Sequence, residues 1–122
     1  MATSPNAGSL DATFLALADA TRRDMIRSLL TRPRRAGELA ETVSMSPQAL
    51  SRHLRVLRRA GLVIEEGIET DARVRVYRVH PDAFAPIESW LAEVEEVWRR
   101  QLQAFKAYAE SGQRTRKLAR ER

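Results

Sequence analysis

The chain has 122 residues, of which 43% are hydrophobic and 30% are charged, and it contains no cysteine. This length and composition predict a single globular domain, and the missing cysteines exclude disulfides, thiolate metal ligands and cysteine nucleophiles. No apolar run approaches the ~18 residues of a membrane span, and residues 1–10 lack the features of a secretory signal, so we expect a cytoplasmic protein without a membrane partner.

The net charge of +5 conceals an uneven distribution along the chain. Residues 20–61 carry ten arginines and three acids, residues 62–98 carry nine acids and three arginines, and residues 99–122 carry eight bases and two acids. Two basic blocks around an acidic one predict a surface that favours a polyanion on one side. Nineteen of the 21 basic residues are arginine, which suits contacts with phosphate and guanine, although a GC-rich genome would produce the same bias.

Three helices are predicted in the N-terminal part of the chain. Small polar residues in 1–10 predict a flexible arm, and the apolar-rich stretch 11–18 predicts the first helix. Asp19 is placed to cap a second helix, which Pro33 ends. The predicted buried stripe of this helix consists of Met25, Ile26, Leu29 and Leu30. Residues 36–43 predict a short third helix, which a turn follows.

The fourth predicted helix has the clearest boundaries. Ser46 is a favoured N-cap residue, Pro47 suits the first helical position and Gly61 is the expected stop, so the helix should span about residues 47–60. On a helical wheel, leucines cluster on one side and basic or amide side chains on the other. The first group is Leu50, Leu54 and Leu57, and the second is Gln48, Arg52, Arg55 and Arg59, which Ser51 flanks.

No acid occurs between Met45 and Gly61. The arginines of this helix repel one another unless an anion is present, and the major groove of DNA provides one to a recognition helix. Glutamine can read adenine, arginine can read guanine, and serine can contact a base or a phosphate. For this helix taken alone, an ordinary solvated basic face is the simpler interpretation.

Residues 62–79 have the two-residue period of strands, and residues 67–71 supply a turn, which together predict a β-hairpin. The second strand places Val74, Val76 and Val79 near one face and Arg73, Arg75 and Tyr77 near the other. Because the hairpin directly follows the helix-turn-helix pattern, we interpret it as a wing whose two arginines reach phosphate or the minor groove. The acidic residues of the hairpin either orient the wing so that Arg73 and Arg75 approach DNA, or simply form a solvated surface. These residues are Glu65, Glu66, Glu69 and Asp71.

Residues 82–111 predict one long helix that ends before Gly112, and residues 112–122 predict a basic, disordered tail. The tail either adds phosphate contacts or simply solvates the end of the chain. Apolar side chains recur every three or four positions along the helix, and they are too numerous to leave in water. We therefore expect a homodimer in which first and last helices of two copies pair. The predicted interface residues are Phe14, Leu15, Leu91, Val94, Trp98, Leu102 and Phe105.

The whole order is α-α-α-α-β-β-α, a mainly α fold with a small β-hairpin, and the domain should span residues 11–111. Three segments, LADATRRDMIRSLL, AGELAETVSMSPQALSRHLRVLRRAGLV and VRVYRV, make residues 11–108 resemble the ArsR/SmtB family of bacterial winged helix-turn-helix repressors. The resemblance implies a homodimer whose two recognition helices read an inverted repeat in double-stranded DNA. It also implies repression by occlusion of a promoter.

The resemblance also implies roles for single residues of the fourth helix. Ser46, Gln48, Ser51 and Arg52 match positions that contact bases and phosphates, Arg55 matches a backbone-contacting position, and His53 matches a position that is often histidine. With the basic residues of the helix and wing, the predicted DNA-binding residues are Ser46, Gln48, Ser51, Arg52, His53, Arg55, Arg59, Arg73 and Arg75.

Many members of this family sense metals, but the residues of their metal sites are missing here. The third helix has no Cys-x-Cys pair, the last helix has no histidine, and His53 and His80 share no ligand spacing. We therefore expect no metal and no cofactor, and the sequence does not identify an effector. It also has no glycine-rich phosphate loop and no Ser/His/Asp grouping, so we expect no enzyme. The alternative to a DNA-binding regulator is a winged-helix module for protein interaction.

Overall fold

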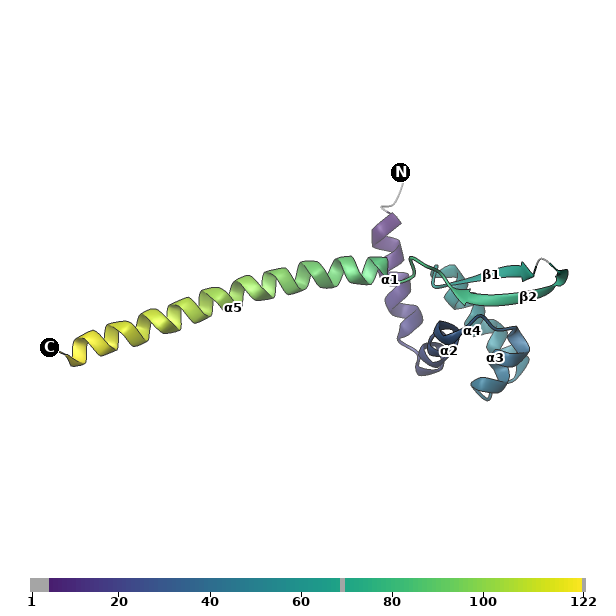
Figure 1. The fold of residues 1–122 in the computed structure, drawn as a ribbon, viewed down its shortest axis with the longest axis horizontal. Helices are drawn as coiled ribbons and strands as arrows, with labels where there is room; N and C mark the ends of the chain where they lie inside the picture. Colours follow the sequence, from purple (N-terminus) through teal and green to yellow (C-terminus); the bar gives the residue numbers. More distant parts are fainter. Residues whose placement is uncertain (1–4, 69, 122) are drawn as a thin grey trace. The chain divides into compact units, whose positions relative to one another are not determined.

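A computed structural model describes residues 5–68 and 70–121, without the side chains of residues 5–9 and 72. The elements follow one another as four helices, two strands and a final helix, which confirms the predicted order (Figure 1). The chain divides into two compact units, residues 1–87 and 88–122. No helix in the described part of the chain is both long and apolar enough to cross a membrane.

Helix α1 spans Pro5–Leu17 and therefore begins well before residue 11, where the sequence predicts it to start. The prediction of a flexible arm is wrong for residues 5–10, and residues 1–4 lie outside the described part. The physical reason is that proline suits the first position of a helix, where its missing N–H would have no partner. Small residues such as those at 6–9 then continue the helix, although Gly8 costs about 1 kcal/mol relative to alanine.

Helix α2 spans Ala20–Thr31, and its N-cap is Asp19, as predicted. The Asp19 carboxylate accepts a hydrogen bond of 3.0 Å from the backbone N–H of Arg22. The predicted buried stripe is confirmed for Met25, Ile26 and Leu29 and is wrong for Leu30, whose side chain is 59% exposed. On the helix, Leu29 and Ile26 lie about 40° and 100° from Met25, whereas Leu30 lies about 140° from it, beyond the edge of the buried face.

The short helix α3 (Ala36–Thr42) and the helix α4 (Pro47–Arg59) form the helix-turn-helix pair. Their inward leucines join residues of α1, α2 and the first strand in one core, which contains Ala16, Met25, Ile26, Leu29, Leu39, Ala40, Leu50, Leu54, Leu57, Leu62, Val63 and Ala83. The predicted boundaries of α4 are confirmed. Gly61 follows its end with a φ of 77°, a left-handed conformation that favours glycine.

Strands β1 (Val63–Ile68) and β2 (Asp71–Val79) form the predicted antiparallel hairpin. Val63 pairs with Val79 and Glu65 with Tyr77, so Tyr77 and Val79 share the face that packs against the core. The expected grouping of Val79 with Val74 and Val76 is therefore wrong, because alternate residues of a strand face opposite sides. Tyr77 also exchanges two backbone hydrogen bonds, of 2.8 and 3.0 Å, with Arg34.

Helix α5 spans Ala85–Arg120, so it starts later and ends later than the sequence predicts. Gly112 lies inside the helix, and the prediction of disorder is wrong for residues 112–120. A glycine inside a helix costs about 1 kcal/mol relative to alanine but does not end it unless the backbone adopts a positive φ. The residues after Gly112 favour the helix, and Lys117 and Arg120 in the last turn suit its negative end.

Candidate nucleic-acid interface

The position of α4 is set by its inner face and by its first turn. Leu50, Leu54 and Leu57 are at most 4% exposed and anchor the helix in the core. At the N-terminus, the Ser46 hydroxyl accepts a hydrogen bond of 3.2 Å from the backbone N–H of Ala49. The preceding turn is closed by a 2.9 Å hydrogen bond from the backbone N–H of Met45 to the carbonyl of Ala40 in α3. These contacts fix which side of α4 faces solvent.

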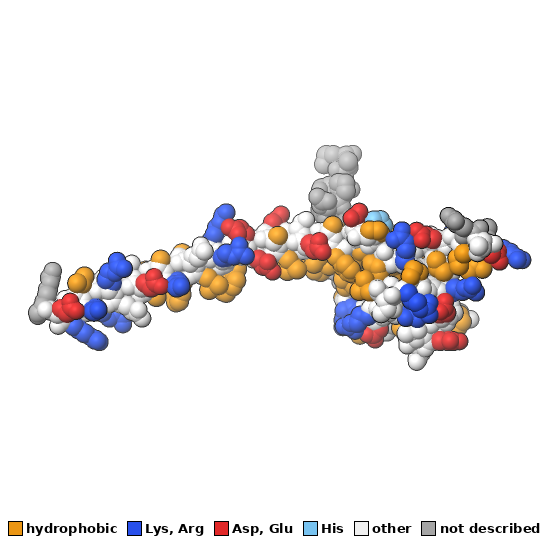
Figure 2. All heavy atoms as spheres, viewed as in Figure 1, with side chains coloured by type: hydrophobic (Ala, Val, Ile, Leu, Met, Phe, Trp, Pro, Cys, Tyr) orange, Lys and Arg blue, Asp and Glu red, His pale blue; other side chains and the backbone are white. Residues whose placement is uncertain are grey.

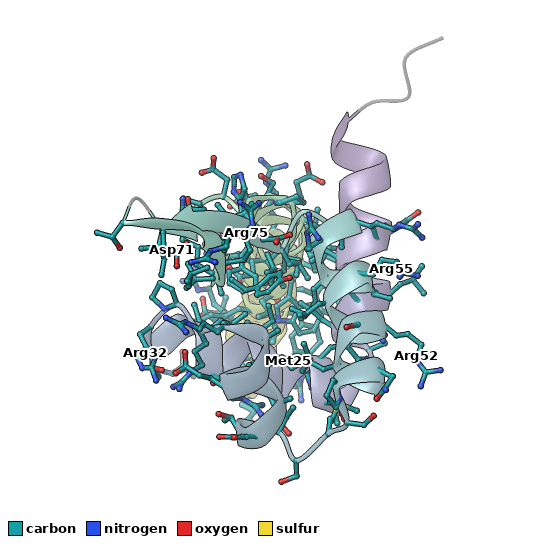
Figure 3. All side chains as sticks on the ribbon, turned by 90° about the vertical axis from the view of Figure 1, so that its right-hand side faces the viewer. Met25, Arg32, Arg52, Arg55, Asp71 and Arg75 are labelled. Carbon is teal, nitrogen blue, oxygen red and sulfur yellow. The ribbon has the colours of Figure 1, made fainter. Side chains whose placement is uncertain are left out.

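The outer face of α4 carries the polar residues that the sequence singles out. Ser46, Gln48, Ser51, Arg52, Arg55 and Arg59 are all exposed. Arg52 and Arg55 project from the helix away from the buried Met25 (Figure 3). Within residues 5–68 and 70–121, no acidic side chain forms an ion pair with Arg52, Arg55 or Arg59. The structure thus brings together an uncompensated cationic surface on one helix.

His53 lies apart from this outer face and is only half-exposed. Its Nδ1 is 3.3 Å from a terminal guanidinium nitrogen of Arg22 in α2. The same guanidinium donates hydrogen bonds to the carbonyls of Ala16 (2.6 Å) and Leu15 (3.1 Å) at the end of α1. His53 therefore lies in a network that joins α1, α2 and α4.

The two arginines that the sequence places near the tip of the wing differ in their surroundings. The Arg73 side chain is 92% exposed and makes only a loose contact of 3.3 Å between its Nε and the Asp71 carboxylate next to it. Arg75 instead pairs with Glu65 on β1, with 2.9 Å between its Nε and a carboxylate oxygen. Figure 3 labels Arg75 beside the strands of the wing and Asp71 nearer the tip. Of the predicted acidic cluster, Glu69 lies outside the described residues.

The sequence does not predict the contacts that Glu65 makes with α4. Its second carboxylate oxygen is 3.0 Å from the guanidinium of Arg58, near the C-terminal end of that helix. An open groove at this junction is lined by Arg55, Arg58, Arg59, Val63, Ile64 and Glu65. No local pattern could reveal the pair, because it depends on how β1 turns back along α4. Burial and the nearby charge of Glu65 raise the pKa of Tyr77, which faces Glu65 across the hairpin.

The outer face of the hairpin has a separate ion pair. Arg78 on β2 is 2.8 Å from Glu66 on β1. The hydrogen bond from Arg78 lowers the pKa of Glu66 below its usual range. Since alternate residues face opposite sides of the hairpin, this pair and the Glu65 contacts lie on different faces.

The predicted interface residues retain much of their exposure in the single chain. Among Phe14, Leu15, Leu91, Val94, Trp98, Leu102 and Phe105, the exposed fraction runs from 42% to 71%. Two further apolar residues of α5, Val97 and Tyr108, are 54% and 79% exposed. Hydrophobic side chains gather along one side of α5 (Figure 2). None of the described residues of α5 is buried.

Histidine, aspartate and glutamate are the side chains of this cysteine-free chain that are most suited to bind a metal ion. Among the residues that the structure describes, no three His, Asp or Glu side chains come together in a way that could hold a metal ion. Asp82 and His80, which are close in sequence, are joined by a 2.9 Å hydrogen bond from the Asp82 backbone N–H to the His80 Nδ1. That contact belongs to the turn before α5.

The inner faces of α3 and α4 are buried in one core, the outer face of α4 is basic and exposed, and a two-stranded hairpin follows. This arrangement defines a winged helix-turn-helix DNA-binding domain. The model of the bacterial regulatory protein arsR family matches residues 19–65. The HTH-type transcriptional regulator Rv2034 of Mycobacterium tuberculosis is 35% identical over 97 residues, which are 80% of this chain and 85% of that protein. The chain belongs to the ArsR family of transcriptional regulators, which is not a class of enzymes.

Two solved structures extend this comparison. An ArsR-like transcriptional regulator from Rhodococcus sp. RHA1 is 29% identical, with a TM-score of 0.72 over 90% of this chain and 98% of that one. The homodimeric winged helix-turn-helix DNA-binding domain of Mb0332 from Mycobacterium bovis, a possible ArsR-family regulator, is 21% identical. Its TM-score is 0.57 over 80% of this chain and 94% of that one, so it shares the fold.

Proposed function

We propose that the protein is a homodimeric repressor that binds a specific inverted repeat in double-stranded DNA. The observation that carries this proposal is the exposed, acid-free face of α4, on which Arg52, Arg55 and Arg59 have no acidic partner among the described residues. Uncompensated arginines on a rigidly held helix suit the major groove, where phosphates surround the edges of the bases. Residues 11–111 would carry both DNA binding and dimerisation.

Within this interface, the N-terminal part of α4 would read bases. Gln48, Ser51 and Arg52 lie on its exposed face, and amide and guanidinium groups can each form two hydrogen bonds with a base edge. Ser46, Arg55 and Arg59 would contact phosphates, as would Arg73 at the wing. Arg75 lies on the same strand as Arg73 but is held by Glu65, so it would contribute little to phosphate binding, and His53 would support α4 through Arg22.

The exposed apolar side chains of α1 and α5 support the proposed homodimer. Leaving Leu15, Trp98 and Phe105 in water, each more than half exposed, is unfavourable, and a second copy could cover them. An interface of about 800 Å² per partner is the usual area of a stable complex. The homodimeric domain of Mb0332, which shares the fold, supports the same arrangement. Two copies related by a twofold axis would read an inverted repeat, and a bound promoter would be occluded.

A gel-shift assay tests the proposal against the protein-interaction alternative. The probe is the DNA directly upstream of the gene for this chain, and the competitor is an excess of shuffled duplex of the same length and composition. We expect retardation that survives the competitor. The absence of any retardation at low salt would contradict DNA binding and favour a module for protein contacts. The acids that would serve such a module, Glu65 and Glu66, are already paired with arginines of the same chain.

A further inference from the structure

Glu65 connects two arginines that come from different elements. One carboxylate oxygen is 3.0 Å from Arg58 on α4, and the other is 2.9 Å from the Nε of Arg75 on β2. The Glu65 side chain is only 18% exposed, whereas those of its two partners are about half exposed. A carboxylate that is mostly withdrawn from water, with one oxygen for each guanidinium, restrains both arginines more firmly than an exposed pair would.

This arrangement separates the arginines of the interface into two groups. Arg52, Arg55 and Arg59 have no acidic partner among the described residues, so each presents a full positive charge. Arg58 and Arg75 share the negative charge of Glu65, which lies beside the groove at the end of α4. Contacts with phosphates add a similar binding free energy on every DNA sequence. Neutralising the charges of Arg58 and Arg75 therefore lowers the affinity for any DNA but leaves the contacts that read bases unchanged.

We infer that Glu65 is a positioning residue that limits sequence-independent DNA binding by holding Arg58 and Arg75 away from phosphates. The inference rests on the proposed DNA-binding function of the α4 surface. Beside that surface, the Glu65 carboxylate binds the two guanidiniums that a DNA phosphate would otherwise bind. Weak sequence-independent binding matters to a regulator because the genome offers a very large number of competing sites.

The test is the substitution Glu65→Gln in the full-length chain, which removes the charge and keeps nearly the same shape. The probe is a 30-base-pair duplex of random sequence, and its dissociation constant is measured from about 0.05 to 0.3 M salt. We expect binding to tighten roughly three- to tenfold at 0.1 M salt. The plot of log affinity against log salt should steepen by about 0.9 for each freed arginine, up to about 1.8.

Glu66→Gln is the matched control. It removes the same charge from the same strand and frees Arg78, but this pair lies on the opposite face of the hairpin. We expect less than a twofold change in affinity and an unchanged salt slope. An equal tightening in both variants would overturn the inference, because it would show a general effect of net charge. Weaker binding by Glu65→Gln with an unchanged slope would also overturn it, because a purely structural residue behaves in that way.

A double-mutant cycle with Arg75→Ala identifies the arginine that is freed. The substitution should change binding to the random duplex little in the native background and should remove a large part of the gain in the Glu65→Gln background. Equal losses in both backgrounds would contradict a restraint by Glu65. If Glu65→Gln loses its cooperative thermal transition, Glu65→Asp tests the same point, because its shorter side chain cannot reach both guanidiniums.

The wild-type protein separates this inference from the function on which it rests. If the wild type binds neither the random duplex nor the upstream DNA at low salt, the proposed function fails. If the wild type binds and Glu65→Gln binds identically at every salt concentration, only the role of Glu65 fails.

Discussion

The arginines of α2 and α4 differ in their surroundings, because each side chain has different neighbours. Arg22 is turned inward, where it donates to the carbonyls of Leu15 and Ala16 and contacts His53. Arg58 faces Glu65, whereas Arg52 is exposed and unpaired within the described part of the chain. Composition alone makes these residues equivalent, whereas their contacts place Arg22 in a packing network and Arg58 in an ion pair and leave Arg52 exposed, as the proposed base contact requires.

At this scale we predict that Arg52→Ala lowers affinity for the operator by about 1–3 kcal/mol and relaxes the preference at one base position. The reason is the loss of two hydrogen bonds to one base edge. Binding to single-base variants of the bound site would measure both effects. An equal loss of affinity on random DNA would contradict a base-reading role for Arg52.

Arg55→Ala serves as the comparison, because Arg55 is one turn further along the same face. We expect it to weaken binding to all sequences alike and to reduce the salt slope by about 1, as the loss of one phosphate contact would. A loss confined to the operator would show instead that Arg55 reads a base.

The N-cap of α2 gives a prediction with a pH dependence. The backbone N–H of Arg22 donates to Asp19 and lowers the pKa of that carboxyl below its usual 3.8. Since the folded pKa is lower than the unfolded one, the stabilisation is complete above about pH 4 and is lost as the pH falls through the folded pKa. Asp19→Ala should therefore cost about 1 kcal/mol at pH 7, and this deficit should shrink on acidification.

Urea unfolding between pH 7 and pH 3 measures this deficit, with Ser46→Ala as the control. Ser46 caps α4 with a neutral hydroxyl, so its substitution should cost a similar amount that does not change with pH. A deficit for Asp19→Ala that stays constant down to pH 3 would contradict the proposed contribution of its charge.

At the scale of elements, single residues in the sequence predicted both ends of α4 correctly, but the start of α1 and the two ends of α5 wrongly. Ser46, Pro47 and Gly61 correctly delimit α4 because a cap, an N-terminal proline and a left-handed glycine each act within a few residues. Pro5 and Gly112 misled the prediction because the same residue types also occur at a helix start and inside a helix. The contact between Arg58 and Glu65 could not be predicted, since it depends on tertiary packing.

Gly112 offers a direct test of the length of α5. A Cβ at Gly112 would meet its nearest heavy atom, in the Arg116 side chain, at 3.7 Å, an ordinary van der Waals contact. Gly112→Ala should therefore stabilise the helix by up to about 1 kcal/mol. Circular dichroism at 222 nm and hydrogen exchange of the amides of residues 109–120 would show an equal or stronger helix. A weaker helix would contradict its continuation to Arg120.

Gly61→Ala is the opposite case in the same chain. The φ of 77° at Gly61 is costly for any residue with a Cβ, so the substitution should destabilise the protein by about 1–2 kcal/mol in urea unfolding. No loss of stability would show that the turn after α4 can relax into another conformation.

At the scale of the whole molecule, one chain carries the exposed basic face of α4, which we propose binds DNA, and the exposed apolar side chains of α5. We predict a molar mass in solution of twice 13.8 kDa. Trp98→Glu should shift the protein toward the monomer, because it would bury a charge in the apolar interface. Sedimentation velocity over a range of concentrations measures the shift.

Gln103→Glu adds the same charge to the same helix, about 140° around the axis from Trp98, and it should leave the dimer intact. If the wild type is a monomer, or if both substitutions dissociate the dimer equally, the apolar side of α5 is not the interface. The weakened dimer should also lose operator affinity, because two half-sites are then no longer bound together.

A hydroxyl-radical footprint of the wild-type protein on the DNA upstream of its gene tests sequence-specific binding by paired α4 helices most directly. We predict two protected half-sites related by an inverted repeat, with centres about 34–36 Å apart or a multiple of that helical turn. Arg52→Ala should lose this pattern at protein concentrations where the wild type shows it. Uniform protection without half-sites, or no protection at low salt, would contradict sequence-specific binding by a pair of α4 helices.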